Sequence, residues 1–401
     1  MPSGPGDTMP LGMGLNTPML APPSHPLARL PEEWAETLAG WGEPAYRGKQ
    51  VFEWIYKHGV FEPRRMSNLP KSLRERLEAE FAGLPLDVSR CFPSRDGTRK
   101  LLVQMGDGAE VETVLIPQLE RDPDIDPADR ADDRADGLVP GDVVTQCISS
   151  QVGCAMGCVF CASGVAGLKR HMTAAEIVSQ VLVGKTYLEG GEHVRNIVLM
   201  GMGEPLHNYD EVARTLVLLT HPLGLALSKR RVTVSTSGLV KQIDRLAEDF
   251  GGQVQLAVSV HAVDDARRSA IMPINRKHAL DELMACLRRY PLPRRRRITI
   301  EYTLIRGVND RVDEADQLAS LLDGVPAKVN LIPMNPIDAS ELGAPDDRAV
   351  QAFRERLAAR GLAAFVRRQR GDDIDAACGQ LAFKGEGPRK RARRSPQVTE
   401  S

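Results

Sequence analysis

Three closely spaced cysteines are the strongest chemical signal in this 401-residue sequence. Cys154, Cys158 and Cys161 form a C-x3-C-x2-C pattern in the run "QVGCAMGCVFCASG". Zinc commonly takes four ligands from two C-x2-C pairs, and this sequence has no second pair. Three thiolates on a short loop suit a cubane iron–sulfur cluster, in which one iron stays open for a small molecule carrying an amine and a carboxylate. Incidental or zinc-binding cysteines are the alternative interpretation.

The elements that must position these cysteines form a repeated βα pattern from residue 142 to about residue 371. Six β-rich runs alternate with amphipathic stretches, and the cysteine loop follows the first run. The runs are "VVTQCIS", "NIVLMG", "RVTVST", "VQLAVSVH", "RITIEYTLI" and "KVNLIPM", and the helices are expected to begin near Thr173, Asp210, Leu239, His278, Val312 and Asp347. The pattern predicts an α/β fold, a partial (β/α)6 TIM-like barrel, over residues 142–383.

The segments outside the barrel differ in composition. Residues 1–26 are rich in proline and glycine, which predicts a disordered leader. Apolar residues three and four apart predict a small helical accessory domain over residues 27–85, and alternating residues predict a β extension over residues 86–141. The extension includes an acidic loop, because residues 120–136 carry eight acids and three arginines. Residues 384–401 are basic and polar, which is typical of a mobile tail.

The composition excludes several classes of protein. The chain has 52 Lys+Arg against 53 Asp+Glu, a formal net charge of −1, and it lacks the run of about 18 apolar residues that a membrane-spanning helix needs. No compact apolar region follows a charged start, so a secretory signal is not expected. The odd count of seven cysteines does not describe a disulfide-stapled secreted domain. We therefore expect a cytoplasmic protein with reactive or metal-binding thiols and no membrane partner.

Four short motifs follow the later β-rich runs: "MGMGEP" (200–205), "STSG" (235–238), "SVH" (259–261) and "NLIPMNP" (330–336). Active sites of βα barrels form at the carboxyl ends of the strands, so these motifs are expected to share a face with the cysteine loop. The candidate binding residues are Gly203, Glu204, Ser235, Ser259, Val260, His261 and Asn335. Four of them also have a structural explanation: Ser235 and Ser259 could cap helices, His261 could be a neutral core residue, and Asn335 before a proline could set a turn.

A C-x3-C-x2-C loop after the first strand of a βα barrel, together with these motifs at the later strand ends, resembles the radical S-adenosylmethionine (SAM) superfamily. The resemblance implies that Cys154, Cys158 and Cys161 bind one 4Fe-4S cluster. It also implies that the residues at the strand ends bind SAM, with Gly203 and Glu204 at its methionyl amine.

Two further cysteines, Cys147 and Cys378, narrow the resemblance. The runs "QCISSQVGCAMGCVFC", "SKRRVTVSTSG" and "RGDDIDAACGQLA" closely resemble the RlmN/Cfr family of RNA adenosine methyltransferases, from about residue 111 to residue 382. The family implies methylation of carbon-2 of an adenosine in the peptidyl-transferase centre of 23S rRNA and, in the RlmN branch, in the tRNA anticodon loop. It further implies two SAM molecules per turnover, an electron donor such as flavodoxin, and a monomer.

The family also implies a role for each thiol. Cys378 takes a methyl group from one SAM, and a radical made from a second SAM removes a hydrogen atom from that methyl group. The carbon radical adds to carbon-2 of the adenine, which is too electron-poor to act as a nucleophile. Glu112 matches the proposed acceptor of the carbon-2 proton, although Glu110 lies on the same strand face. Cys147 then attacks the Cys378 sulfur, which releases the RNA and leaves a transient disulfide.

Two alternatives remain open at this point. Carbon-8 methylation by the Cfr branch would use the same cysteines, and a zinc-stabilised RNA-binding protein would have no catalysis. Three basic runs, at residues 229–231, 294–297 and 367–370, are expected to contact RNA phosphates in any of these cases.

Overall fold

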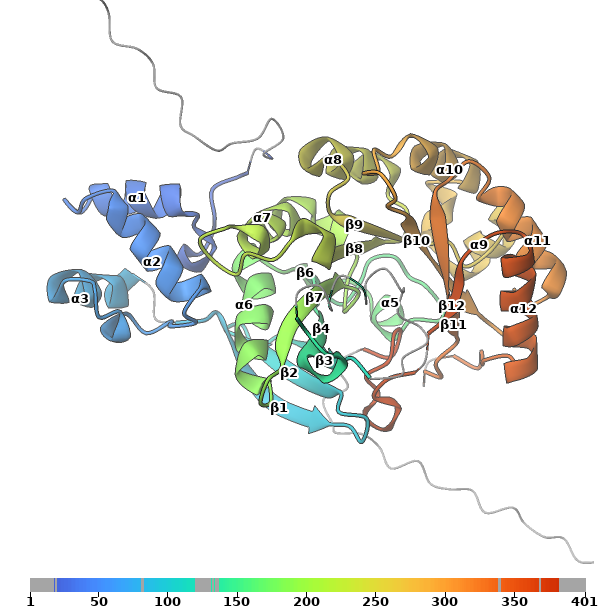
Figure 1. Cartoon of the computed structure of the whole chain (residues 1–401), viewed down its shortest axis with the longest axis horizontal. Helices are drawn as coiled ribbons and strands as arrows, with labels where there is room; N and C mark the ends of the chain where they lie inside the picture. The colour runs from blue at the N-terminus through green and yellow to red at the C-terminus, as the bar shows by residue number, and fades with distance from the viewer. Residues whose placement is uncertain are drawn as a thin grey trace, which may run out of the picture.

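The computed structural model describes residues 18, 20–80, 83–119, 131, 133, 137–337, 340–367 and 369–381. The basic tail and most of the leader and of the acidic loop that the sequence predicts lie outside the described residues. Figure 1 shows the N-terminal helices beside a larger body, in which helices surround a large sheet.

Three helices form the N-terminal region, as the sequence predicted: α1 (Pro31–Ala39), α2 (Tyr46–Tyr56) and α3 (Lys71–Glu80). The first helix begins at a proline, whose missing N–H is not needed in a first turn. The Glu33 carboxylate accepts the Leu30 N–H at 2.7 Å and so caps this end. Trp34, Leu38 and Phe52 are fully buried in a core that is continuous with that of the barrel.

The close packing of α1 on α2 depends on Gly48. A Cβ at this position would lie 2.5 Å from the Ala35 nitrogen and from the Pro31 oxygen, which are main-chain atoms that cannot rotate away. We expect Gly48→Ala to separate the two helices and to lower the free energy of unfolding by about 1–3 kcal/mol, measured by chemical denaturation. Gly40→Ala is the control, because a Cβ there would meet nothing closer than 3.4 Å. Equal losses in the two variants would contradict the packing argument.

A ten-stranded sheet runs through the described residues in the order β1-β2-β3-β4-β7-β8-β9-β10-β11-β12. Its first three strands, β1 (Leu86–Pro93), β2 (Arg99–Met105) and β3 (Glu110–Pro117), pair antiparallel with one another. The third strand also pairs antiparallel with β4, where Val114 lies opposite Cys147. The three strands therefore continue the barrel sheet, and β3 runs beside the strand that ends at Cys147.

The remaining seven strands are parallel to one another: β4 (Val143–Cys147), β7 (His193–Leu199), β8 (Val232–Thr236), β9 (Gln255–Ser259), β10 (Ile298–Leu304), β11 (Ala327–Pro333) and β12 (Ala364–Val366). The first six match the six β-rich runs, so the predicted α/β partial barrel is confirmed. The sequence did not predict β12, because three residues are too few for a recognisable pattern. Among the described strands, β1 and β12 are the two edges of the sheet and do not pair with each other.

Six helices begin within two residues of their predicted starts: α6 (Ala174–Gly184), α7 (Tyr209–Thr220), α8 (Val240–Phe250), α10 (Leu280–Arg289), α11 (Val312–Leu321) and α12 (Asp347–Ala359). The sequence did not predict α5 (Ala162–Ala166), α9 (Asp265–Ile271) or the short pair β5 (Gln151–Val152) and β6 (Arg170–His171). These elements are too short to show a period. None of the described helices is long and apolar enough to cross a lipid bilayer.

Helix α7 connects the helical region to the barrel through a buried arginine. Arg214 on this helix donates to both carboxylate oxygens of Glu33, at 2.8 and 2.9 Å, and to the Ala28 oxygen at 3.0 Å. The guanidinium is almost completely buried, so the bidentate pair is a directional contact between the two parts. Within the helical region, the Tyr56 hydroxyl donates a buried hydrogen bond to the Leu27 oxygen at 2.6 Å.

Candidate active site

The cysteine loop follows β4 and β5 and is held by close backbone contacts. Gly153 has a φ of +76°, and a Cβ there would lie 1.8 Å from the Gly167 oxygen. The Cys154 N–H donates to that same oxygen at 3.1 Å. Gly164 on α5 packs against the backbone of Cys158, where a Cβ would lie 2.9 Å from the nitrogen and the oxygen. These contacts fix the course of the loop that carries the three cysteines.

The thiols of Cys154, Cys158 and Cys161 lie close enough to influence one another. Burial raises the pKa of Cys154 to about 12, and the Glu204 carboxylate and the Cys161 thiol contribute to the increase. Burial also raises the pKa of Cys158, and the other two thiols add to this shift. Cysteines bind metals as thiolates. Burial and the neighbouring thiols disfavour these negative charges, and a cationic iron centre would stabilise them. The residues present therefore fit an iron–sulfur cluster.

A cubane cluster and a single metal ion need different arrangements of ligands. Among the residues that the structure describes, no three His, Cys, Asp or Glu side chains are arranged to hold one metal ion. In a cubane cluster each thiolate binds a different iron, so the three sulfurs are spread more widely than the ligands of one ion. The three thiols thus remain the candidate ligands of a 4Fe-4S cluster.

Gly203 and Glu204 lie where β7 ends, against the segment that leads into the cysteine loop. Gly203 has a φ of +109°, and a Cβ there would lie 2.7 Å from the Cβ of Gln151. The Glu204 carboxylate accepts the N–H groups of Ser237 at 2.7 Å and Leu206 at 3.1 Å, while its own N–H donates to Gln151 Oε1 at 2.8 Å. Burial raises the pKa of this carboxyl group, and the hydrogen bonds oppose that shift. Glu204 therefore ties the carboxyl ends of β7 and β8 together.

The other candidate SAM contacts lie at the next strand ends. Ser235 and Ser259 are half-buried in the neighbouring strands β8 and β9, and Val260 and His261 follow β9 and are buried. His261 has a φ of +58°, and its Nδ1 accepts a main-chain N–H of β10 at 2.8 Å. Burial is the main reason that its pKa falls to about 3, so the ring is neutral at pH 7. The ring packs edge-to-face on Phe160 of the cysteine loop, 4.8 Å away. Contact of these residues with SAM stays a prediction.

The C-terminal segment that carries Cys378 lies against the cysteine loop. The Asn335 side-chain amide donates to the Cys378 oxygen at 2.9 Å, and the Gly379 oxygen accepts the Ala162 N–H at 2.8 Å. The structure thus joins three regions that are far apart in the chain. Asn335 was predicted as a SAM contact, and its amide nitrogen holds the Cys378 segment in place.

Cys147 and Cys378 are near each other at the same face. Burial is the main cause of the raised pKa of Cys147, and the Cys378 thiol raises it further. Cys378 is exposed, yet the surrounding protein raises the pKa of its thiol as well, so this group is enclosed on several sides and open on one. All seven cysteines fall within the described residues and are free thiols.

Glu112 and Lys100 form a buried ion pair next to the Cys378 segment. The Lys100 Nζ lies 3.0 Å from Glu112 Oε1 and donates to the Asp375 oxygen at 3.2 Å. Glu110 is more exposed, and its carboxylate accepts the Ser89 hydroxyl at 3.2 Å. Of the two glutamates, Glu112 is therefore the one that is connected to the Cys378 segment. Lys100 was not predicted as a site residue, because a lysine in an amphipathic strand usually faces water.

Two of the basic runs lie at the opposite end of the barrel. Residues 229–231 and 294–297 directly precede β8 and β10, so they lie at the amino ends of strands whose carboxyl ends carry the candidate site. Arg231 is buried, with its guanidinium 2.6 Å from an oxygen of Asp133. The prediction of an RNA phosphate contact is wrong for this residue. Arg370 of the third run is also engaged within the protein, because it donates to Asp96 at 2.7 Å.

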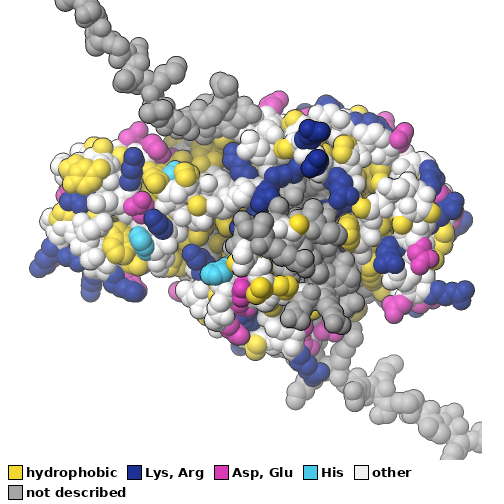
Figure 2. Space-filling model, viewed as in Figure 1, with side chains coloured by type: hydrophobic (Ala, Val, Ile, Leu, Met, Phe, Trp, Pro, Cys, Tyr) yellow, Lys and Arg dark blue, Asp and Glu magenta, His cyan; other side chains and the backbone are white. Residues whose placement is uncertain are grey.

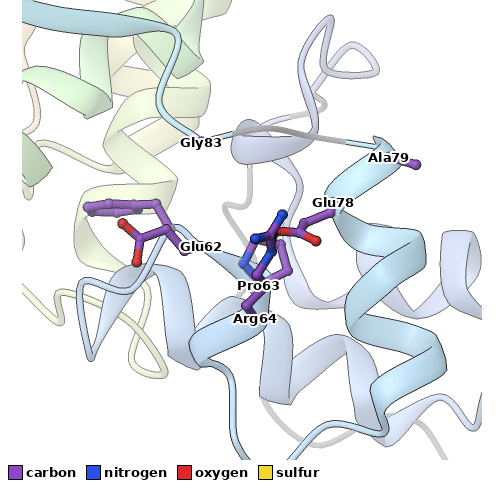
Figure 3. Close-up of a pocket in the computed structure, with 7 residues that line it drawn as sticks. Glu62, Pro63, Arg64, Glu78, Ala79 and Gly83 are labelled. Carbon is purple, nitrogen blue, oxygen red and sulfur yellow. Dashed lines mark hydrogen bonds and ion pairs between the residues drawn. The ribbon is translucent and has the colours of Figure 1, made fainter.

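Exposed cations also occur on the helical region. Figure 2 shows Lys and Arg side chains gathered at the end of this region near α3. The side chains of Arg64 and Arg65 are 82% and 68% exposed. A cavity of about 390 Å³ lies beside them, lined by Phe61, Glu62, Pro63, Arg64, Glu78, Ala79 and Gly83 (Figure 3). None of the predicted site residues lines this cavity, so it is separate from the candidate active site.

The fold and the cysteine loop define a class of protein. The family model of the radical SAM superfamily matches residues 148–319, and that of the ribosomal RNA large subunit methyltransferase N-terminal domain matches residues 31–82. The crystal structure of a radical SAM methyltransferase from Sphaerobacter thermophilus is similar, with a TM-score of 0.80 and 43% identity over 90% of this chain and 99% of that one. The protein is therefore a radical SAM enzyme, a class that implies a 4Fe-4S cluster and SAM.

Two relatives make the assignment more specific. The dual-specificity RNA methyltransferase RlmN of Sorangium cellulosum (strain So ce56) is 59% identical over 93% of this chain and 99% of its own length. The protein of the same description from Marinobacter nauticus is 42% identical over 92% of this chain and 94% of its own length. The chain belongs to the RlmN family and is a SAM-dependent RNA methyltransferase.

Proposed function

We propose that this enzyme methylates carbon-2 of an adenosine in the peptidyl-transferase centre of 23S rRNA and of an adenosine in the tRNA anticodon loop. The observation that carries the proposal is the position of the Cys378 segment. It contacts the cysteine loop through the Ala162–Gly379 hydrogen bond, and it contacts Lys100, whose partner Glu112 lies on the strand beside the one that ends at Cys147. A barrel that only cleaved SAM would need the three thiols of the cysteine loop but not Cys147 and Cys378. Two classes of RNA substrate are supported by the relatives, which are described as dual-specificity RNA methyltransferases.

The two thiols have different tasks in the proposed reaction. The Cys378 thiolate attacks the methyl carbon of SAM, so that a sulfur–carbon bond forms and S-adenosylhomocysteine leaves. When bound at the cysteine loop, the cluster supplies the electron that cleaves a second SAM. A hydrogen atom passes from the methyl group on Cys378 to the 5′-deoxyadenosyl radical made from that second SAM, and the resulting carbon radical bonds to carbon-2 of the adenine. The adduct would then pass the carbon-2 proton to Glu112 and give one electron back to the cluster. The Cys147 thiolate then attacks the Cys378 sulfur, which forms a disulfide and breaks the sulfur–carbon bond. The released carbon takes up a proton and becomes the methyl group of the freed RNA.

Glu112 is proposed to accept the carbon-2 proton. Its carboxylate is held 3.0 Å from the Lys100 ammonium group, and a carboxylate fixed in position is suited to act as a general base. The same ammonium group bonds to the Asp375 oxygen, three residues before Cys378, so the pair is tied to the segment that carries the RNA adduct. A positioned carboxylate of this kind typically contributes on the order of 10²–10⁴-fold to the rate.

The remaining assignments follow from the same site. SAM is proposed to bind at the strand ends through Gly203, Glu204, Ser235, Ser259, Val260, His261 and Asn335, with two molecules used per turnover. The helical region, here taken as residues 27–85, is proposed to help hold the RNA through exposed cations such as Arg64. The enzyme would work in the cytoplasm as a monomer and receive electrons from a donor such as flavodoxin.

The proposal is tested by blocking the final step. We expect Cys147→Ala to accumulate RNA covalently bound to the Cys378 peptide, because addition proceeds while the attack that releases the RNA is lost. The adduct is detected as a protein band that shifts on nuclease treatment and as a Cys378 peptide carrying a nucleotide in mass spectrometry. Absence of the adduct, with the cluster intact, would overturn the proposed mechanism.

Cys286→Ala is a matched control, because Cys286 is fully buried in α10 and its thiol lies near the Val240 oxygen. It should give no adduct. The position of the methyl group is settled separately by mass spectrometry of digested rRNA, where methylation confined to carbon-8 would replace our assignment by that of the Cfr branch. Metal analysis of anaerobically purified protein addresses the zinc alternative, since one equivalent of zinc without iron or sulfide would favour it.

A further inference from the structure

A buried arginine lies between the strand ends and the cysteine loop. Arg268 on α9 is 0% exposed and uses all three of its nitrogens as donors. Its Nε bonds to the Val260 oxygen at 3.0 Å, and its Nη2 bonds to the oxygens of Ser237 at 2.7 Å and Ser259 at 2.9 Å. Its Nη1 bonds to Asn275 Oδ1 at 2.8 Å. One guanidinium thus ties together the chain segments that leave β8 and β9.

The charge of Arg268 is not neutralised by a direct partner. It forms no ion pair with any acidic residue that the structure describes, and its acceptors are three carbonyl oxygens and one amide oxygen. The nearby Asp265 carboxylate instead accepts the Asn275 amide and the Leu280 N–H, both at 2.9 Å. Burial lowers the pKa of Arg268 to about 10, so the side chain stays protonated at pH 7. A buried cation without a carboxylate partner opposes folding, which suggests a use in function.

The cysteine loop packs against the helix that carries this charge. The Val159 N–H donates to the oxygen of Ile271, the last residue of α9, at 3.1 Å. The same helix contributes to a small hydrophobic cluster with Cys158 and its neighbours on the loop. Arg268 lies one turn before Ile271 on α9, so its charge is carried by the part of the helix that the loop contacts.

We infer that Arg268 is a positioning residue with two effects: it sets the strand ends of β8 and β9 for SAM binding, and its charge favours reduction of a cluster held by Cys158. The inference rests on the proposed SAM contacts at Ser235 and Ser259, and it does not depend on which adenosine carbon is methylated. An iron–sulfur cluster gains negative charge when it is reduced, and net charge around a cluster is one of the factors that set its potential. A cation in a low-dielectric interior interacts strongly with that added charge.

Two substitutions separate the effects in anaerobically reconstituted full-length protein. Arg268→Lys keeps the charge, but one ammonium group cannot span the four acceptors, so we expect the Kd for SAM to rise on the order of tenfold with the cluster midpoint potential unchanged. Arg268→Gln removes the charge as well, so the SAM Kd rises and the midpoint potential falls. SAM binding is measured by equilibrium dialysis with radiolabelled SAM, and the potential by redox titration followed by electron paramagnetic resonance.

Arg214→Lys is the matched control for replacing a buried arginine. Arg214 is 3% exposed and bonds from α7 to Glu33 on α1. The Arg214→Lys variant should therefore lose stability without changing the SAM Kd or the midpoint potential. An unchanged potential in Arg268→Gln would overturn the charge effect. Should that variant not fold, Arg268→Lys still tests the inference, because a wild-type SAM Kd in it would overturn the positioning role.

Ser259→Ala distinguishes failure of this inference from failure of the proposed SAM site. It removes a hydroxyl at the end of β9 and leaves the main-chain oxygen that Arg268 holds. Suppose that SAM affinity is weakened in Ser259→Ala but is at the wild-type level in Arg268→Lys. This result would contradict the positioning role of Arg268 and leave the proposed SAM site standing. Wild-type SAM affinity in Ser259→Ala would contradict the proposed SAM contacts instead.

Discussion

Cys378→Ala is expected to abolish RNA methylation, with a loss on the order of 10⁴-fold or more, because no thioether can form to carry the methyl group. The protein should still fold, since the Cys378 side chain is exposed and it is the main-chain oxygen that bonds to Asn335. The measurement is the amount of methyladenosine in digests of rRNA and tRNA incubated with the reconstituted enzyme.

Cys91→Ala is the control for this result, because Cys91 is a half-buried residue of β1 and has no proposed task. It should methylate RNA at the wild-type rate. Cys378→Ala should also retain its cluster and its ability to bind SAM, which separates loss of the methyl carrier from loss of the site. Methylation by Cys378→Ala at more than a tenth of the wild-type rate would contradict the proposed covalent mechanism.

Gly153→Ala is expected to prevent cluster binding, with less than about a tenth of the wild-type iron retained after reconstitution. Two causes act together. Alanine is disfavoured at a φ of +76°, and its Cβ would lie 1.8 Å from the Gly167 oxygen. The Cys154 N–H bonds to that same oxygen, so relief of the clash must move Cys154 and the loop behind it. Iron and sulfide analysis and the visible absorbance of the cluster measure the loss.

Gly167→Ala is the matched control, because Gly167 also has a positive φ, of +73°, and a Cβ there would meet nothing within 4 Å. This variant carries conformational strain without the clash. Gly167 combines its positive φ with a ψ of 169°, a conformation almost confined to glycine, and the strain costs about 1–3 kcal/mol. We therefore expect it to bind the cluster nearly as well as the wild type. Equal losses of iron in Gly153→Ala and Gly167→Ala would show that strain, and not the close approach, limits the loop.

The sequence by itself determined the order of the barrel elements and the candidate ligands. The six strands and the six longer helices were predictable because alternating and helical periods recur over enough residues to be recognised. Gly203 and His261 could be assigned to the candidate site from sequence because each follows a strand, and strand ends of a parallel sheet meet at one edge. The elements α5, α9 and β12 were missed because they are too short for a period to emerge.

Only the tertiary structure decided which distant residues meet. Nothing in the local sequence places Lys100 between Glu112 and the segment of Cys378, or buries Arg268 beside the cysteine loop. The same holds for Arg231, which looked like a solvated phosphate contact and is buried against Asp133. A charged residue normally faces water, and its burial is stabilised by partners that the fold brings from elsewhere in the chain. Sequence patterns report local periodicity, whereas these long-range contacts exist only once the sheet has brought its strands together.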